Sequence, residues 1–148
     1  MTNRRMGTLT SCCKAHGIIL AYLFGSQREA GKAYLQGHPV QPTAASDLDI
    51  GLVFKVLPEA RMQAYGAIYA DLARIFDPFP VDPIFLQETS YLFQFEAIKG
   101  ELIYAESERD VDLYEGTVLS FASDISFHKE TFEREVMEAL EDGYFEIG

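Results

Sequence analysis

Continuous runs of apolar residues occur at three places along the chain and have the length of buried β-strands. They cover Ile18–Phe24, Ile50–Phe54 and Val81–Leu86, and the last of them contains a single acid, Asp82. A shorter strand-like segment follows at Glu101–Ala105. Runs of this length, bounded by turn residues, are typical of buried strands. The pattern therefore predicts a small sheet.

Between these runs the apolar positions recur every three or four residues, as they do on one face of a helix. This spacing predicts helices over Gly7–His16, over 27–36 and over Ser90–Lys99. A longer helix is expected to begin at Pro58-Glu59, because Pro suits the first turn and Glu the positive end of the helix dipole, and to end at Asp77-Pro78. Helices that alternate with strands predict an α/β or α+β domain.

From Val111 the pattern predicts one C-terminal helix of about 30 residues, which would be about 45 Å long. A glycine inside a helix costs about 1 kcal/mol, so the helix could break at Gly116. We expect residues 1–148 to form a single domain, with a core over about 10–105 and a C-terminal helical segment over about 109–142. The apolar stripe of this segment is expected to face the core; it comprises Tyr114, Val118, Phe121, Ile125, Phe132, Val136 and Leu140.

The composition is that of an ordinary globular domain, with 48% apolar and 24% charged residues. These fractions exclude a disordered, collagen-like or coiled-coil chain. No apolar run approaches the roughly 18 residues that a membrane span needs. The basic start, Met1–Met6, has no apolar segment of a signal peptide behind it, so we expect a cytoplasmic protein.

The two cysteines, Cys12 and Cys13, are adjacent in the sequence. Adjacent cysteines rarely form an unstrained disulfide, and two are too few for a disulfide framework, so we expect both to be reduced. A metal site here would need further ligands. His16 is the only nearby candidate, which disfavours such a site.

The net charge of −11 is concentrated in the last third of the chain. Residues 1–100 hold nine acidic and nine basic side chains, whereas residues 101–148 hold fourteen acids against Arg109, Lys129 and Arg134. The acidic segment is either a solvated helix face or a docking surface for a basic partner. Because it would repel a phosphate backbone, a nucleic-acid substrate is disfavoured.

Three acids lie where the predicted strands begin or run. Asp47 and Asp49 stand at the entry to the second strand and Asp82 lies inside the third; an Asp beside Ser46 is also a common turn residue. Strand side chains alternate, so Asp47 and Asp49 point to one face, with Cα atoms roughly 6.5 Å apart. If Asp82 is on the neighbouring strand, three carboxylates converge, and hard oxygen ligands select Mg²⁺ or Mn²⁺ rather than zinc.

A Gly-Ser pair, Gly25-Ser26, ends the first strand. A glycine there lets the backbone approach a ligand closely, and a serine that opens a helix aims its N–H and hydroxyl at an anion. The pair alone is a weak signal. It gains weight from the order of elements, which is a strand, Gly-Ser, a helix, a loop, Asp-x-Asp on a second strand and a lone Asp on a third.

This order resembles the DNA polymerase β-type nucleotidyltransferase superfamily, and within it the minimal nucleotidyltransferases. The matching residues are Phe24-Gly25-Ser26, then Ser46-Asp47-Leu48-Asp49-Ile50, then Val81-Asp82, and the likeness continues through Ala97–Tyr104. It covers roughly residues 10–125 and implies a small mixed sheet flanked by helices. The chain departs from the family in two respects. Twenty residues separate Ser26 from Asp47, about twice the usual number, and Gln27 stands between Gly-Ser and the expected Arg.

The resemblance implies transfer of a nucleoside monophosphate, most often AMP from ATP, to a hydroxyl with release of pyrophosphate. It assigns Asp47 and Asp49 to two metal ions, Mg²⁺ or Mn²⁺, and Asp82 to the ion on the nucleophile side and to the proton of the acceptor. Gly25 and Ser26 would hold the triphosphate.

Minimal members of the family often act as antitoxins that modify a tyrosine on a helical HEPN-type toxin, so the resemblance implies such a protein partner. Two alternatives stay open. One is a catalytically idle antitoxin that works by contact alone. The other is an aminoglycoside-type nucleotidyltransferase, although those enzymes usually carry a larger helical second domain.

Overall fold

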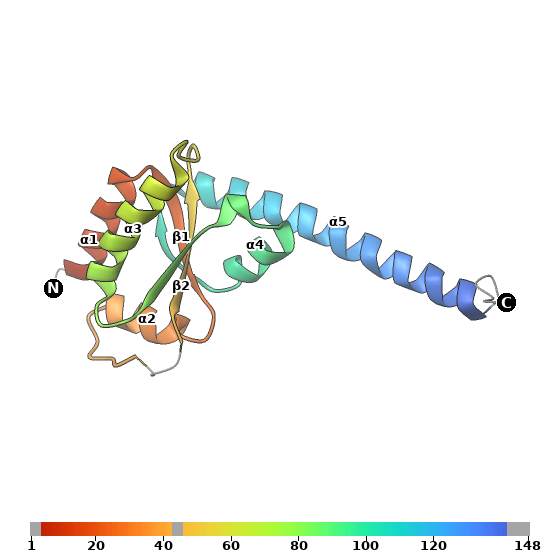
Figure 1. Cartoon of the computed structure of the whole chain (residues 1–148), viewed down its shortest axis with the longest axis horizontal. Helices are drawn as coiled ribbons and strands as arrows, with labels where there is room; N and C mark the ends of the chain where they lie inside the picture. Colours follow the sequence, from red (N-terminus) through yellow and green to blue (C-terminus); the bar gives the residue numbers. More distant parts are fainter. Residues whose placement is uncertain (1–3, 43–45, 142–148) are drawn as a thin grey trace.

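A computed structural model describes residues 4–42 and 46–141, apart from the side chains of Ser126 and Glu141 (Figure 1). The elements, in chain order, are α1 (Arg4–Ala15), β1 (Ile18–Phe24), α2 (Arg28–Leu35), β2 (Leu48–Phe54), α3 (Arg61–Phe76), β3 (Val81–Phe85), the short 3₁₀ helix η1 (Leu86–Glu88), α4 (Tyr91–Ile98), β4 (Glu101–Ala105) and α5 (Glu108–Glu141). Every strand and helix that the apolar pattern predicts is present.

The start of α3 differs from the expectation. The helix begins at Arg61 rather than at Pro58-Glu59. Leu57 packs against the core before the helix begins, so Pro58 and Glu59 belong to the connection from β2. The start of α4 follows its sequence signal, because the Ser90 hydroxyl accepts a hydrogen bond from the backbone N–H of Phe93 at 3.2 Å and caps the helix.

The four strands form one mixed sheet in the order β3-β2-β1-β4. β1 pairs with β2 and β4 in antiparallel fashion, whereas β2 and β3 are parallel. The class is therefore α+β, as expected. The parallel pair determines the position of the acids, because its register sets Asp49 of β2 opposite Asp82 of β3.

Helices cover both faces of the sheet (Figure 1). The larger core lies under α1 and α3 and includes Leu9, Leu52, Ile68, Leu72 and Phe76, all of them buried. The smaller core lies on the other face, under α4 and α5, around Leu20, Tyr22, Val53, Leu86 and Ala97. Each Leu, Ile, Val or Phe side chain stabilises the fold by about 1.5–3 kcal/mol when it is fully buried. The sheet is thus a rigid support with different surroundings on its two faces.

The last helix, α5, is continuous from Glu108 to Glu141, and Gly116 does not break it. Its first half packs on α4, β1 and β4, and Val118 is fully buried there. Beyond Ala122 the helix extends away from the domain (Figure 1). The expectation of a core-facing stripe along the whole helix is therefore wrong, because Phe121, Ile125, Phe132 and Leu140 are exposed. The expected end of the segment, residue 142, lies outside the described residues.

The two cysteines are free, as expected, and both are buried in α1. Burial raises the pKa of the Cys12 thiol to about 11 and that of Cys13 to about 12. Among the described residues, no helix combines the length and the apolar character that crossing a membrane requires.

Candidate active site

The parallel pair β2 and β3 places two of the predicted acids side by side. Asp49 and Asp82 are register partners, so their side chains leave the same face of the sheet. This is the face of the smaller core, because the alternate positions Leu48, Ile50 and Leu52 all enter the larger core. Asp47 lies just before β2 and is exposed. Asp82 therefore lies on the strand next to Asp49, which is the condition that the sequence analysis set for the acids to converge.

The electrostatics of Asp49 reflect its burial and the two neighbouring acids. Partial burial raises the pKa of the Asp49 carboxyl above its usual value, and the negative charges of Asp82 and Asp47 raise it further. A divalent cation would relieve this repulsion, and the oxygen donors suit Mg²⁺ or Mn²⁺. The residues present therefore fit the metal ions that the motif implies.

The three carboxylates do not form a closed cluster. Among the described residues, the group of three whose ligand atoms lie within 4.8 Å of one another is Cys12, His16 and Asp71, not the aspartates.

The turn after β1 places the backbone of Gly25 against the side chain of Asp49. Phe24, the last residue of β1, pairs with Asp49, and Gly25 follows with a φ of +79°. A Cβ at Gly25 would collide with Oδ2 of Asp49. Only glycine allows this approach, both because of its positive φ and because it has no side chain. Ser26 is exposed in the turn beyond it.

Gln27 moves the arginine one position further along the chain, but the Arg28 side chain still contacts the Gly-Ser turn. Gln27 is buried at the start of α2, and Arg28 follows as the first residue of the helix. The Arg28 Nη1 donates a hydrogen bond to the carbonyl of Gly25 at 3.1 Å, and its backbone N–H approaches the same oxygen at 3.4 Å. The guanidinium therefore remains beside the Gly-Ser turn.

A cavity of about 510 Å³ opens between this turn and α4. It is lined by Phe24, Gly25, Arg28, Asp49, Glu96, Lys99 and Gly100. Arg28 and Lys99 bring positive charge to the side of Asp49, which is the combination that a metal-bound polyphosphate requires. The ammonium of Lys99 pairs with Glu96 at 2.8 Å across an exposed turn of α4, so a phosphate could compete for it.

Sequence reasoning proposed the acids and the Gly-Ser turn as site residues but not Arg28 and Lys99, which line the same cavity as Gly25 and Asp49. Arg28 could have been found from the family pattern, in which an arginine follows Gly-Ser. Lys99 lies in the matching segment Ala97–Tyr104, but its place beside the cavity depends on how α4 packs against β1.

Replacing Asp49 with Asn should raise the melting temperature of the metal-free protein at neutral pH. Because the folded-state pKa of Asp49 is raised, the folded chain holds this proton more tightly than the unfolded chain does. Wild-type stability is therefore lost as the pH rises from the ordinary Asp pKa through the raised one, and the Asn variant escapes this loss. Thermal unfolding in chelator from acid to neutral pH measures the effect. Asp112→Asn, at an exposed position of α5, is the control, and an Asp49→Asn variant no more stable than wild type would contradict the prediction.

Comparisons with known proteins agree with this architecture. The chain is similar to one chain in the crystal structure of a mutant toxin–antitoxin MntA-HpeT, with a TM-score of 0.65 and 17% identity over 89% of this chain and 98% of that chain. A second similar chain comes from a tri-AMPylated Shewanella oneidensis HEPN toxin in complex with an MNT antitoxin, with a TM-score of 0.61 and 17% identity over 93% of this chain and 99% of that one.

A third similar structure is a toxin–antitoxin with AMP-PNP, with a TM-score of 0.62 and 18% identity over 89% of this chain and 98% of that chain. At these identities the likeness shows the fold. No curated protein sequence matches the chain. The family model described as polymerase beta, nucleotidyltransferase, matches residues 8–109, a range that contains β1, the Gly-Ser turn and all three acids. With more than half of its length matched, the chain belongs to the polymerase β nucleotidyltransferase family.

Proposed function

We propose that the chain is a metal-dependent adenylyltransferase that moves AMP from ATP to a hydroxyl of a partner protein. The observation that carries the proposal is the register pair Asp49 and Asp82, of which Asp49 lies against Gly25 and lines a cavity with two cationic side chains. A nucleotidyltransferase needs carboxylates, a close backbone and positive charge at one place, and these residues supply all three.

Asp47, Asp49 and Asp82 would hold Mg²⁺ or Mn²⁺, since their oxygens are hard ligands. Partial burial, and then the charges of Asp82 and Asp47, raise the pKa of Asp49, and a cation would offset those charges. When bound, the ions polarise the phosphates and favour the deprotonated form of the attacking hydroxyl. Gly25 and Ser26 bind the triphosphate through the turn, and Arg28 and Lys99 neutralise its charge from the cavity wall.

In the proposed reaction the acceptor oxygen attacks the α-phosphorus of ATP, a new P–O bond forms, and the bond to the bridging oxygen between the α- and β-phosphorus breaks. Asp82 accepts the proton of the hydroxyl. Pyrophosphate leaves with the electron pair of the broken bond. The positive charges of Arg28 and Lys99 offset its negative charge. Asp49 and Asp82 leave the α4 face of the sheet, and Gly25, Arg28 and Lys99 line the cavity beside Asp49.

The proposed acceptor is a tyrosine of a HEPN-type toxin, which makes the chain an antitoxin acting in the cytoplasm. Support comes from the fold, which is shared with a chain in the complex of an AMPylated HEPN toxin and an MNT antitoxin. The family match and the similar fold point in the same direction, since the family supplies the chemistry and the similar complexes supply a class of partner.

The outer half of α5 offers a surface for that partner. Ile125, Phe132 and Leu140 are exposed and lie along one stripe of the helix, which continues from Phe121, whose ring stacks on Tyr91 of α4. Exposed acidic side chains surround this part of the helix: Glu133 and Glu135 flank the stripe, and Glu130 and Glu138 lie further round the helix. The proposed occupant is the toxin, through an apolar patch with a basic rim, because such a patch would cover the stripe and offset the surplus acids.

Mg²⁺ with ATP should raise the melting temperature of the wild-type chain. A ligand at a hundredfold excess over its Kd stabilises a fold by about 2.7 kcal/mol, or about 5–10 °C for a domain of this size. The double variant Asp47→Asn with Asp49→Asn should lose the rise, because the metal ligands are gone. Differential scanning fluorimetry measures both, with Asp112→Asn as the control. A wild-type chain that gives no rise would favour the idle antitoxin, and an unchanged rise in the double variant would exclude this metal site.

A further inference from the structure

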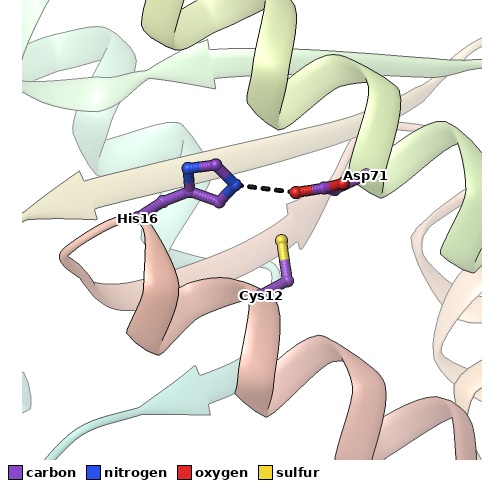
Figure 2. A group of neighbouring side chains, drawn as sticks. All are labelled: Cys12, His16 and Asp71. Atoms are coloured by element: carbon purple, nitrogen blue, oxygen red, sulfur yellow. Dashed lines mark hydrogen bonds and ion pairs between the residues drawn. The ribbon is translucent and has the colours of Figure 1, made fainter.

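A second cluster of metal-ligating side chains lies on the opposite side of the sheet from the active site. Cys12 lies in α1, His16 directly follows the end of α1, and Asp71 lies in α3 (Figure 2). Their ligand atoms all lie within 4.8 Å of one another. His16 Nε2 and Asp71 Oδ2 are 2.7 Å apart, and Figure 2 shows the Cys12 sulfur pointing toward the gap between them.

Each ligand is held by regular structure. Cys12 and His16 are four residues apart, and the helical hydrogen bond from the His16 N–H to the Cys12 carbonyl, at 3.1 Å, keeps both on one face. Gly17, with a φ of +70°, then ends the helix and fixes the position of His16. Asp71 lies within α3, which packs directly on α1. The cluster is therefore preorganised by two helices rather than by a loop.

The geometry favours a metal site over a proton relay. In a relay the two ring nitrogens of His serve different partners, one the nucleophile and the other the acid. Here the thiol and the carboxylate both approach the Nε2 side of the ring (Figure 2).

The surroundings suit a bound cation as well. The second carboxylate oxygen of Asp71, Oδ1, faces the Arg74 guanidinium at 3.5 Å, which leaves Oδ2 for the cluster. Such an outer partner is common for a ligating carboxylate. A cavity of about 480 Å³ adjoins the site and is lined by Cys12, Asp71 and Arg74 among others. It gives a water molecule access to a fourth ligand position.

We propose that Cys12, His16 and Asp71 bind one Zn²⁺ ion, with a water molecule from the adjoining cavity completing a tetrahedral site. Thiolate, imidazole and carboxylate are the ligand types of protein zinc sites, and the thiolate disfavours Mg²⁺. Ligands around tetrahedral zinc lie about 3.5 Å from one another, so gathering these three requires shifts of about 1 Å. The ion would link α1 to α3 and stabilise the larger core. This inference does not depend on the proposed transferase reaction.

The test is a titration of the full chain, first freed of metal by a chelator, with Co²⁺ and then Zn²⁺. Co²⁺ should give a thiolate-to-cobalt charge-transfer band, which reports a bond to sulfur and does not respond to the carboxylate site. Zn²⁺ should displace the band, and the displacement gives the zinc affinity of this site alone. Excess Mg²⁺ should leave the band unchanged.

Loss of an outer-shell partner alone costs about 10–100-fold in metal affinity, so Cys12→Ser, His16→Ala and Asp71→Asn should each cost about 100-fold or more. Cys13→Ala, next in the sequence but pointing into the core, and His38→Ala, in an exposed loop, are matched controls that should retain the band. A wild-type chain without the band, or a Cys13→Ala variant that loses it as fully as Cys12→Ser, would overturn the proposal. The wild-type spectrum decides the question even where a variant fails to fold.

Discussion

Replacing Asp82 with Asn should abolish nucleotidyl transfer while leaving the affinity for ATP close to that of the wild type. Asp82 acts on the acceptor hydroxyl in the proposed reaction, and loss of a proton acceptor lowers a rate by about 10²–10⁴-fold. Asp49 lies instead in the nucleotide cavity against Gly25, so Asp49→Asn should lose both transfer and binding. Transfer is measured with ATP labelled at the α-phosphate and a purified HEPN-type toxin as acceptor, and binding by calorimetry with ATP and Mg²⁺.

Asp112→Asn serves again as the control, because Asp112 is exposed on α5 and does not line the nucleotide cavity. Equal loss of ATP binding in the Asp82 and Asp49 variants would contradict the roles assigned to them. If the wild type binds Mg²⁺ with ATP but labels no toxin, the proposed nucleotide site is supported and the proposed acceptor is wrong.

Introducing a charge at Phe132 should weaken binding of the toxin by about 30-fold or more. A central aromatic anchor of an interface is worth about 2 kcal/mol or more, and Phe132 is 66% exposed in the middle of the apolar stripe. The measurement is the Kd of Phe132→Asp for the purified toxin. Phe127→Asp is a matched control, because Phe127 is 64% exposed but lies about 140° away around the helix axis.

The acidic side chains around the outer half of α5 can be tested in the same assay. Glu133→Lys with Glu138→Lys should slow association, and added salt should slow association of the wild type, since both weaken electrostatic steering. Binding of ATP and Mg²⁺ should not change. If Phe132→Asp and Phe127→Asp weaken the complex equally, the stripe is not the contact surface. If neither salt nor charge reversal has an effect, the acidic residues are merely solvated.

The exposed part of α5 shows where periodicity stops being informative. Phe121, Ile125 and Phe132 recur at helical spacing, and the same spacing continues from Val118, which is buried. The pattern identifies one apolar face of a helix, and this was correct for the whole of α5. Whether another element covers that face depends on where the sheet and α4 end, and no local spacing records this.

The cluster of Cys12, His16 and Asp71 also shows what local spacing in the sequence cannot predict. Cys12 and His16 carry a recognisable four-residue spacing in the sequence, but two ligands are too few to predict a metal site. The third, Asp71, is 55 residues from His16 and reaches it only because α3 packs on α1. A site that the sequence alone disfavoured therefore becomes a proposal once the two helices are placed.

The sequence by itself determined the strands, the helices and the acids of the candidate active site. Asp82 interrupts an apolar strand, and Asp47 and Asp49 alternate at the entry to another. Both patterns are local, so they follow from backbone geometry and from the free-energy cost of burying a charge. Only the tertiary structure decided that Asp49 pairs with Asp82, that Arg28 and Lys99 share a cavity and that the end of α5 is exposed. These depend on contacts between distant segments. The direction of a side chain is fixed within its own element, but its neighbours are fixed by the packing of the whole chain.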